Sequence, residues 1–301
     1  MVSAQRRVRR AKSKVKSRNT SILIKVLIPV IVVVSLFLFL RLSTKYWDGH
    51  NKVSYVFQEP SGDTGIIVLD PVLTEETTFT IPGGTQVDVA RGYGQFRIKN
   101  VWQLGLNEKL GGGLLAQTVT DDFLFPTTLW SERDLSNLWQ FVFSPGKTNI
   151  LFGDRLQMAL FVLKVKSIDK TEIDLGKNQF LKKQILTDGA PGYVQNGPIS
   201  GRLTVYFSDN DFANQNLKFG LVNASGNPAI TNGVGAILEV LGGKIVSADR
   251  QDTNNSLDCN VLGQNSDAVK KVAVLFSCQV ISGKSDFDLE MRMGPKFAKR
   301  F

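Results

Sequence analysis

The chain has 301 residues, of which 43% are apolar and 21% are charged, with one histidine and two cysteines. This composition is that of a folded protein, and it excludes a disordered or collagen-like chain. One histidine and two cysteines also leave almost no material for a zinc site or for Ser-His catalysis.

The net charge of +9 comes from the N-terminal end. Of the 36 Lys/Arg, 11 lie in residues 1–45, which hold no acid, so 25 Lys/Arg face 27 Asp/Glu in the rest of the chain. Repulsion between these charges predicts a basic tail over 1–21 that does not fold alone. The tail is too short for a DNA-binding domain, so we expect no nucleic-acid partner. We expect it to contact anionic lipid headgroups instead.

Residues 22–42 are predicted to form a single transmembrane helix. The run from Ile22 to Leu40 contains one charge, Lys25, and its 19 residues would span about 28 Å as a helix. Positive charge before the span predicts a cytoplasmic N-terminus and an extracytoplasmic region over 43–301. The alternative is a cleaved signal peptide, but no small-residue cleavage site follows Leu40.

Strand and helix signals alternate after the predicted anchor, which is followed by an expected stalk over 43–61. Apolar runs and alternating patterns predict strands at 66–69, 77–81, 85–89 and 202–207, helices at 100–110 and 114–123, a helix opened by the capping-box spacing of Ser131, and a helix or strand at 156–164. This alternation predicts an α/β or α+β domain over 51–208.

The C-terminal segment gives a clearer order. We predict strands at 217–222, 244–248, 256–262, 278–281 and 287–293, and helices at 229–241 and 267–276. This order predicts a small two-layer α/β sandwich over 209–301. Cys259 and Cys278 lie on strands that flank the second helix, so they can form a disulfide outside the cytoplasm or remain two buried thiols.

The C-terminal segment also resembles the LytR C-terminal domain family over 209–299. Members of that family have a strand, a turn of the form Asn-Gly-Thr/Ser-Gly, and a helix that ends in Leu-x-x-x-Gly. The matching positions here are Asn223, Ser225, Gly226, Leu238 and Gly242, and Ala224 replaces a usual glycine.

In that family the domain commonly follows a LytR/CpsA/Psr (LCP) phosphotransferase domain, and residues 51–208 resemble one. Thr80-Ile-Pro-Gly-Gly-Thr85 is similar to its Ser-Ile-Pro-Arg-Asp-Thr signature, and Asp63-Thr is similar to its opening strand. Arg97-Ile-Lys99-Asn and Asp154-Arg155-Leu-Gln are similar to later segments. The resemblance implies a pocket that gathers Asp63, Arg97, Lys99 and Arg155, with Asp63 as its weak candidate for a metal ligand.

The chain departs from the LCP signature at Gly83 and Gly84, which stand where that family has Arg and Asp. Moving a glycopolymer from a polyprenyl pyrophosphate requires cations against phosphate oxygens, and glycine supplies none. We therefore expect a non-catalytic envelope protein that binds wall polymer or a protein partner, without a cofactor. The alternatives are an LCP-type phosphotransferase, which would need Mg²⁺, and a membrane-tethered envelope regulator.

Overall fold

The computed structural model describes residues 46–301 except 48, 198–200 and 254–255. The chain divides into two compact units, Met1–Lys45 and Tyr46–Phe301, and only the second is described. The predicted tail over 1–21 and transmembrane helix over 22–42 therefore lie outside the described residues. Within the described part of the chain, no helix has the length and hydropathy needed to cross a membrane.

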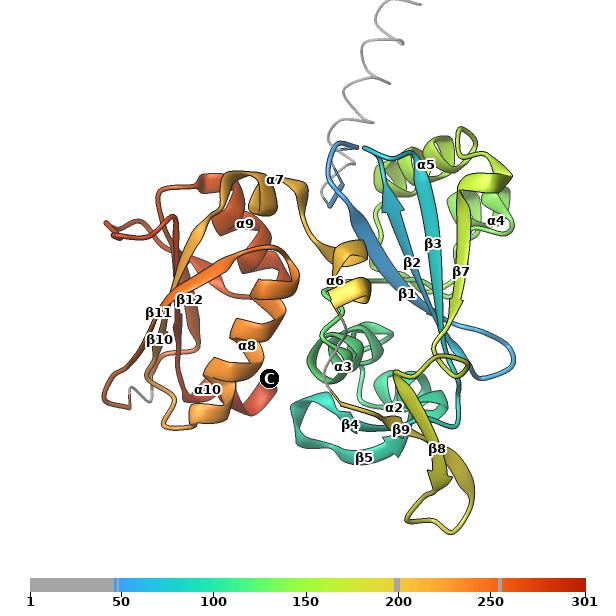
Figure 1. The fold of residues 1–301 in the computed structure, drawn as a ribbon, viewed down its shortest axis with the longest axis horizontal. Helices are drawn as coiled ribbons and strands as arrows, with labels where there is room; N and C mark the ends of the chain where they lie inside the picture. The colour runs from blue at the N-terminus through green and yellow to red at the C-terminus, as the bar shows by residue number, and fades with distance from the viewer. Residues whose placement is uncertain (1–45, 48, 198–200, 254–255) are drawn as a thin grey trace, which may run out of the picture. The chain divides into compact units, whose positions relative to one another are not determined.

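A five-stranded mixed sheet organises the first part of this unit (Figure 1). Its strands, in the order β6-β1-β2-β3-β7, are Leu129–Trp130, Val53–Gln58, Thr64–Asp70, Glu75–Ile81 and Lys170–Asp174. The β1–β2 and β2–β3 pairs are antiparallel, whereas β6 and β7 run parallel to their neighbours. The stalk predicted over 43–61 is wrong for Val53–Gln58, since this segment carries buried Tyr55 and Val56 into the sheet.

Both faces of this sheet are covered, which explains why every residue of β2 is buried. Ile66 and Val68 point into one core, shared with α2 (Val101–Asn107) and α3 (Gly113–Phe123). Ile67 and Leu69 point into another, shared with α4 (Leu138–Phe143) and α5 (Phe152–Val162). The strands are therefore the middle layer of three.

Smaller elements complete this part. They are the hairpins β4–β5 (Gln86–Val89 and Gly94–Arg97) and β8–β9 (Leu181–Ile185 and Pro191–Gln195), the 3₁₀ turns η1 (Ala90–Gly92), η2 (Ile98–Asn100) and η3 (Ser167–Asp169), and the helix α6 (Gly201–Phe207). The strand predicted at 202–207 is wrong, because Leu203 and Phe207 are buried at helical spacing while Val205 is exposed. Ser131 opens no helix and lies in an isolated bridge.

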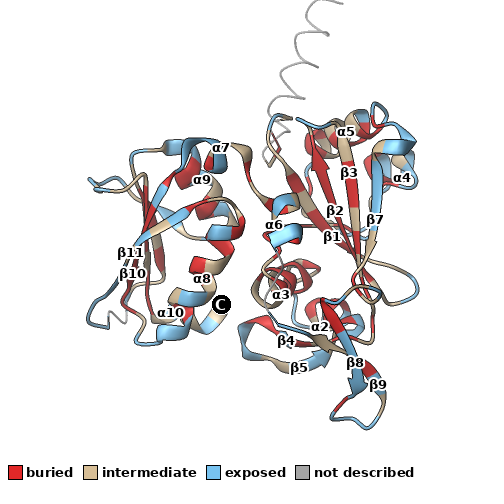
Figure 2. Ribbon diagram, viewed as in Figure 1, coloured by how far each residue is buried: buried red, intermediate tan, exposed pale blue. Residues whose placement is uncertain are grey.

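The C-terminal part confirms the predicted order of strands and helices. Its sheet, β11-β10-β14-β12-β13, comprises Lys244–Arg250, Lys218–Asn223, Leu289–Met293, Cys259–Leu262 and Gln279–Val280. The helices α8 (Pro228–Val240) and α9 (Ser266–Leu275) share one core with this sheet. Buried residues face that core along α8 and the strands (Figure 2), and Phe219 and Leu221 are among them. Two short helices, α7 (Asn210–Gln215) and α10 (Pro295–Arg300), were not predicted.

Candidate functional site

The segment that resembles the LCP signature folds as a turn packed against the loop that precedes β2. The Asp63 carboxylate accepts a 2.7 Å hydrogen bond from the Gly83 N–H, and the Lys99 N–H donates to the Gly83 carbonyl oxygen. A Cβ atom on Gly83 would lie only 2.5 Å from the carbonyl oxygen of Gly62. Position 83 therefore has no room for any side chain unless the backbone moves.

Gly84 differs from Gly83 in its surroundings. A Cβ atom there would meet Nη1 of Arg97 at 3.5 Å, which is an ordinary contact. Arg97 itself binds Asp188 through two hydrogen bonds of 2.8 and 2.9 Å and also donates to the Ala190 and Pro191 carbonyls. The hydrogen bond from Arg97 lowers the pKa of Asp188 to about 2. The guanidinium group of Arg97 is thus occupied in holding the loop between β8 and β9.

The structure brings together three of the four residues predicted for this pocket, around the turn of Gly83 and Gly84. The fourth, Arg155, donates to the carbonyl oxygens of Ile150 and Val142 between α4 and α5, and burial lowers its pKa. Among the described residues, no group of three His, Cys, Asp or Glu side chains is placed to hold a metal ion. Asp63 accepts from the Gly83 N–H through Oδ1. Burial, and then the charge of Asp63, raise the pKa of the neighbouring Glu59 carboxyl.

The turn that resembles the LytR C-terminal family is also internally bonded. Asn223 donates to the Asn227 carbonyl and the Thr231 hydroxyl, and its Oδ1 accepts from the backbone and hydroxyl of Ser225. Gly226 has a φ of +79°, a conformation that glycine adopts without strain. These residues fix the entry to α8.

A cavity of about 230 Å³ lies where α3 and β6 face α9 and α10. It was not predicted from the sequence. Bare glycines at Gly111 and Gly112 make room for Trp130, since Cβ atoms there would lie 2.9 and 2.6 Å from its ring. Trp130 packs edge-on against Trp102 with ring centroids 5.7 Å apart. One wall of the cavity is therefore an indole held by its neighbours.

Two charged side chains from the first part of the unit line the same cavity. Arg91, in η1, adopts a left-handed conformation with φ of 68° and binds the Gln117 side-chain oxygen through Nε. Its two terminal nitrogens have no hydrogen-bond partner among the described residues. Asp121, on α3, has one carboxylate oxygen that is buried and unpartnered within the described part of the chain. Burial raises its pKa well above the ordinary value.

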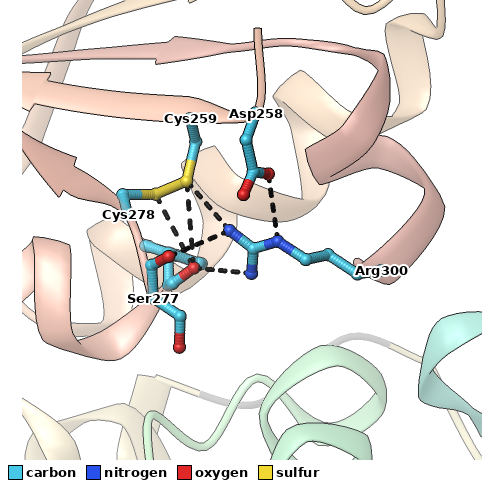
Figure 3. The surroundings of a disulfide bond; sticks show 6 residues. Asp258, Cys259, Ser277, Cys278 and Arg300 are labelled. Atoms are coloured by element: carbon cyan, nitrogen blue, oxygen red, sulfur yellow. Dashed lines mark hydrogen bonds and ion pairs between the residues drawn. A yellow bond between two sulfur atoms is a disulfide. The ribbon is translucent and has the colours of Figure 1, made fainter.

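Arg300 closes the opposite side of the cavity and is held by the disulfide between Cys259 and Cys278 (Figure 3). Its Nη2 lies 3.0 Å from the Cys259 sulfur, its Nη1 donates to the Phe276 carbonyl, and its Nε pairs with Asp258. The Arg300 carbonyl oxygen accepts a hydrogen bond from the Gln117 amide of α3. This network attaches α10 to α3 and fixes the wall of the cavity.

The chemistry of this cavity is that of recognition. A guanidinium group with unbound nitrogens, a carboxyl group with an unbound oxygen and an indole ring are groups that bind hydroxyls, phosphates and sugar rings. The cavity volume is smaller than that of pockets for drug-sized ligands, which is about 300–1,000 Å³.

Comparison with solved structures finds partial similarity to LCP proteins. B. subtilis TagV is 12% identical, with 51% of this chain and 92% of that chain covered and a TM-score of 0.37. The LytR-CPS2A-psr family protein TagT with bound octaprenyl pyrophosphate lipid is also 12% identical, with 51% and 87% covered and a TM-score of 0.36. Lin1025 of Listeria innocua is 11% identical, with 48% and 92% covered and a TM-score of 0.35.

At these identities and TM-scores the similarity is partial. The ligands of those proteins are therefore not assigned to this chain by the comparison. No protein-family model and no curated protein sequence matches this chain.

Proposed function

We propose that this chain is a membrane-anchored, extracytoplasmic cell-envelope protein that binds a wall glycopolymer without transferring it. The observation that carries the proposal is the contact between Gly83 and Gly62. A side chain at position 83 would require the Gly62 carbonyl to move, so the turn cannot present an arginine to a phosphate as the LCP signature does.

The neighbouring groups support the same conclusion about catalysis. Phosphoryl transfer needs fixed cations, and often a metal, against the oxygens of the transferred group. Here Arg97 is bound to Asp188 and Asp63 accepts from the Gly83 N–H. Magnesium has a place only in the transferase alternative, where Asp63 would be its sole predicted ligand.

The proposed location rests on two features of the chain. The basic tail and the apolar run over 22–42 have the charge pattern of an anchor with its N-terminus in the cytoplasm. The disulfide between Cys259 and Cys278 favours an oxidising compartment, since disulfides are rare in the cytosol. Both features support exposure of residues 43–301 outside the membrane.

The proposed ligand follows from the cavity of Arg91, Asp121 and Trp130. The free guanidinium nitrogens match a phosphate or vicinal hydroxyls, the carboxyl group matches sugar hydroxyls, and the indole offers an apolar face. We favour a glycopolymer unit over a protein side chain as the ligand, because a sugar unit offers hydroxyl or phosphate groups to the guanidinium and carboxyl groups and a ring face to the indole.

The test is a transfer assay with the full chain in detergent, magnesium and a polyprenyl-pyrophosphate-linked glycopolymer. We expect no release of phosphate and no polymer transfer above the level of a protein-free control, together with saturable binding of the polymer. Turnover that disappears in Asp63→Asn would overturn the proposal in favour of the transferase. Absence of both binding and turnover would overturn it in favour of the envelope regulator.

A further inference from the structure

Exposed apolar side chains gather at one end of the first sheet. At this end β1 begins, β2 ends, and β3 and β7 begin, as the pairings of Val53 with Leu69 and of Glu76 with Lys170 show. Figure 1 shows α4 and α5 at this same end. The exposed apolar residues of the β2–β3 loop, of α4, of α5 and its C-cap, and of the turn before β7 are called the anchor-side face below; they are Val72, Leu73, Trp139, Phe143, Leu160, Leu163 and Ile168. Patches of this kind on soluble surfaces mark contact with a partner or a membrane.

The residues of α4 and α5 in this face form one continuous strip. Trp139 and Phe143 lie one helical turn apart with ring centroids at 4.3 Å, and Phe143 lies 5.9 Å from Phe152 at the start of α5. Leu160 and Leu163 follow Phe152 on the same side of α5 by helical periodicity. Trp139 is 72% exposed and Leu163 is 71% exposed, so the strip is not covered by this chain's described residues.

The chain enters this unit directly beside the strip. The backbone N–H groups of Tyr46 and Trp47 donate to the Asp154 carboxylate in the first turn of α5. The Trp47 ring packs on Phe161 of the same helix at 5.5 Å. Only residues 41–45 separate Tyr46 from the end of the apolar run at Leu40. A connection of this length reaches about 20 Å at most, so the anchor of the proposed function would keep α5 close to the membrane.

The charge of this segment complements an anionic surface. Between Leu135 and Ile168 the one acid is Asp154, which is fully buried, whereas Lys147, Lys164 and Lys166 are exposed. Asp134 and Asp169 border this segment, and Glu132 accepts from the Lys147 backbone, so Lys164 and Lys166 are the lysines that carry the positive charge beside the strip. Figure 2 shows exposed surface along α4 and at the end of α5. An apolar strip with aromatic rings and lysines beside it is the composition of a surface that lies in a membrane interface.

We infer that the anchor-side face docks on the outer leaflet of the membrane, with Trp139 and Phe143 at the headgroup level and the lysines against anionic phospholipid. The inference rests on the anchor of the proposed function. Its consequence is that the ectodomain is held in one orientation at the membrane by a second attachment.

The test uses the full chain reconstituted in vesicles of phosphatidylcholine and phosphatidylglycerol that carry brominated acyl chains, which quench tryptophan fluorescence on contact. Wild type should be quenched, and Trp139→Phe should lose most of the quenching. Leu163→Ser should weaken the quenching of Trp139 by lifting the strip away from the lipid. The matched control is Ile185→Ser, an equally exposed apolar residue on β8, which should change nothing.

Alkaline extraction of the same vesicles separates the two claims. Chain that stays in the vesicles but shows equal quenching in wild type and Trp139→Phe overturns the docking alone. Chain released at alkaline pH overturns the anchor, and the docking with it. Retention together with loss of quenching in Trp139→Phe, and weaker quenching when phosphatidylglycerol is omitted, supports both.

Discussion

The turn of Gly83 and the cavity of Arg91 each contain an aspartate and an arginine, but these side chains differ in how many of their polar atoms are hydrogen-bonded. At the turn, Asp63 and Arg97 bind the backbone and Asp188, so their charges serve the fold. In the cavity, Arg91 has unbound nitrogens and Asp121 a buried oxygen without a partner among the described residues. Unpartnered buried polar groups are costly and uncommon. This difference is why we propose the cavity, and not the family-like turn, as the binding site.

The largest expected effect is a loss of stability on the cavity side, where the disulfide holds Arg300. Replacing both Cys259 and Cys278 with serine removes a bridge with a sequence separation of 19, and should lower the free energy of unfolding by about 3 kcal/mol. Denaturant titration measures this change. Because Arg300 contacts the Cys259 sulfur, the variant should also exchange amide hydrogens faster in α10. Unchanged stability would contradict the structural role of the bridge.

A matched pair of glycine substitutions tests the turn. Gly83→Ala places a Cβ 2.5 Å from the Gly62 carbonyl oxygen, whereas Gly84→Ala places one 3.5 Å from Nη1 of Arg97, which is an ordinary contact distance. The first should cost about 2 kcal/mol because the backbone must shift, and the second well under about 1 kcal/mol. Thermal and denaturant unfolding of both variants check this. Equal stability of the two would show that the turn has space for a side chain at position 83.

Polymer binding should respond to the cavity. Arg91→Gln removes the positive charge but keeps an amide N–H that can donate a hydrogen bond. It should weaken glycopolymer binding about tenfold, or about 1.4 kcal/mol. Isothermal titration measures the change, and a smaller salt dependence should accompany it. Lys99→Gln, near the Gly83 turn, serves as the matched loss of one positive charge and should bind like wild type.

The smallest expected effect is a pH dependence of stability. Burial first, and then the neighbouring Asp88 carboxylate, raise the pKa of Asp122 to about 7. The native state therefore holds a proton that the unfolded chain has already lost, so stability should fall by about 1 kcal/mol as pH rises from about 6 to about 7.5. Denaturant titrations at both values measure the change in stability. Asp122→Asn should remove its own part of that change and leave the part due to Asp121, whose pKa burial also raises. A slope of the opposite sign would contradict the burial of this carboxyl.

Secondary-structure elements could be predicted from the sequence where the pattern of apolar residues fits only one element type and one kind of burial. Ile66–Leu69 is a continuous apolar run because β2 is covered on both faces, and α8 ends at Val240, just before Gly242-Gly243, as its pattern indicates. Residues 202–207 alternate like a strand, yet packing of Leu203 and Phe207 makes them a helix. Tertiary contacts overrode the local pattern there.

The candidate sites show the same limit. The glycine at position 83 was visible in the sequence, but the contact with Gly62 that requires glycine was not. The cavity combines Arg91, Asp121, Trp130 and Arg300, which are up to 209 positions apart. No periodicity or short motif joins such positions, because only the packing of α10 against α3 brings them together.

Equilibrium binding of a labelled wall glycopolymer to wild type, Arg91→Gln/Asp121→Asn and Asp63→Asn tests the central claim most directly. The two Asp→Asn substitutions keep the size of the side chain, whereas Arg91→Gln shortens it and removes its charge. The amide introduced by Asp63→Asn retains an oxygen to accept from the Gly83 N–H. We predict saturable binding to wild type, the same affinity for Asp63→Asn, and a loss of at least about tenfold for the cavity variant. Full binding by the cavity variant with loss in Asp63→Asn would place the ligand at the turn and contradict the account.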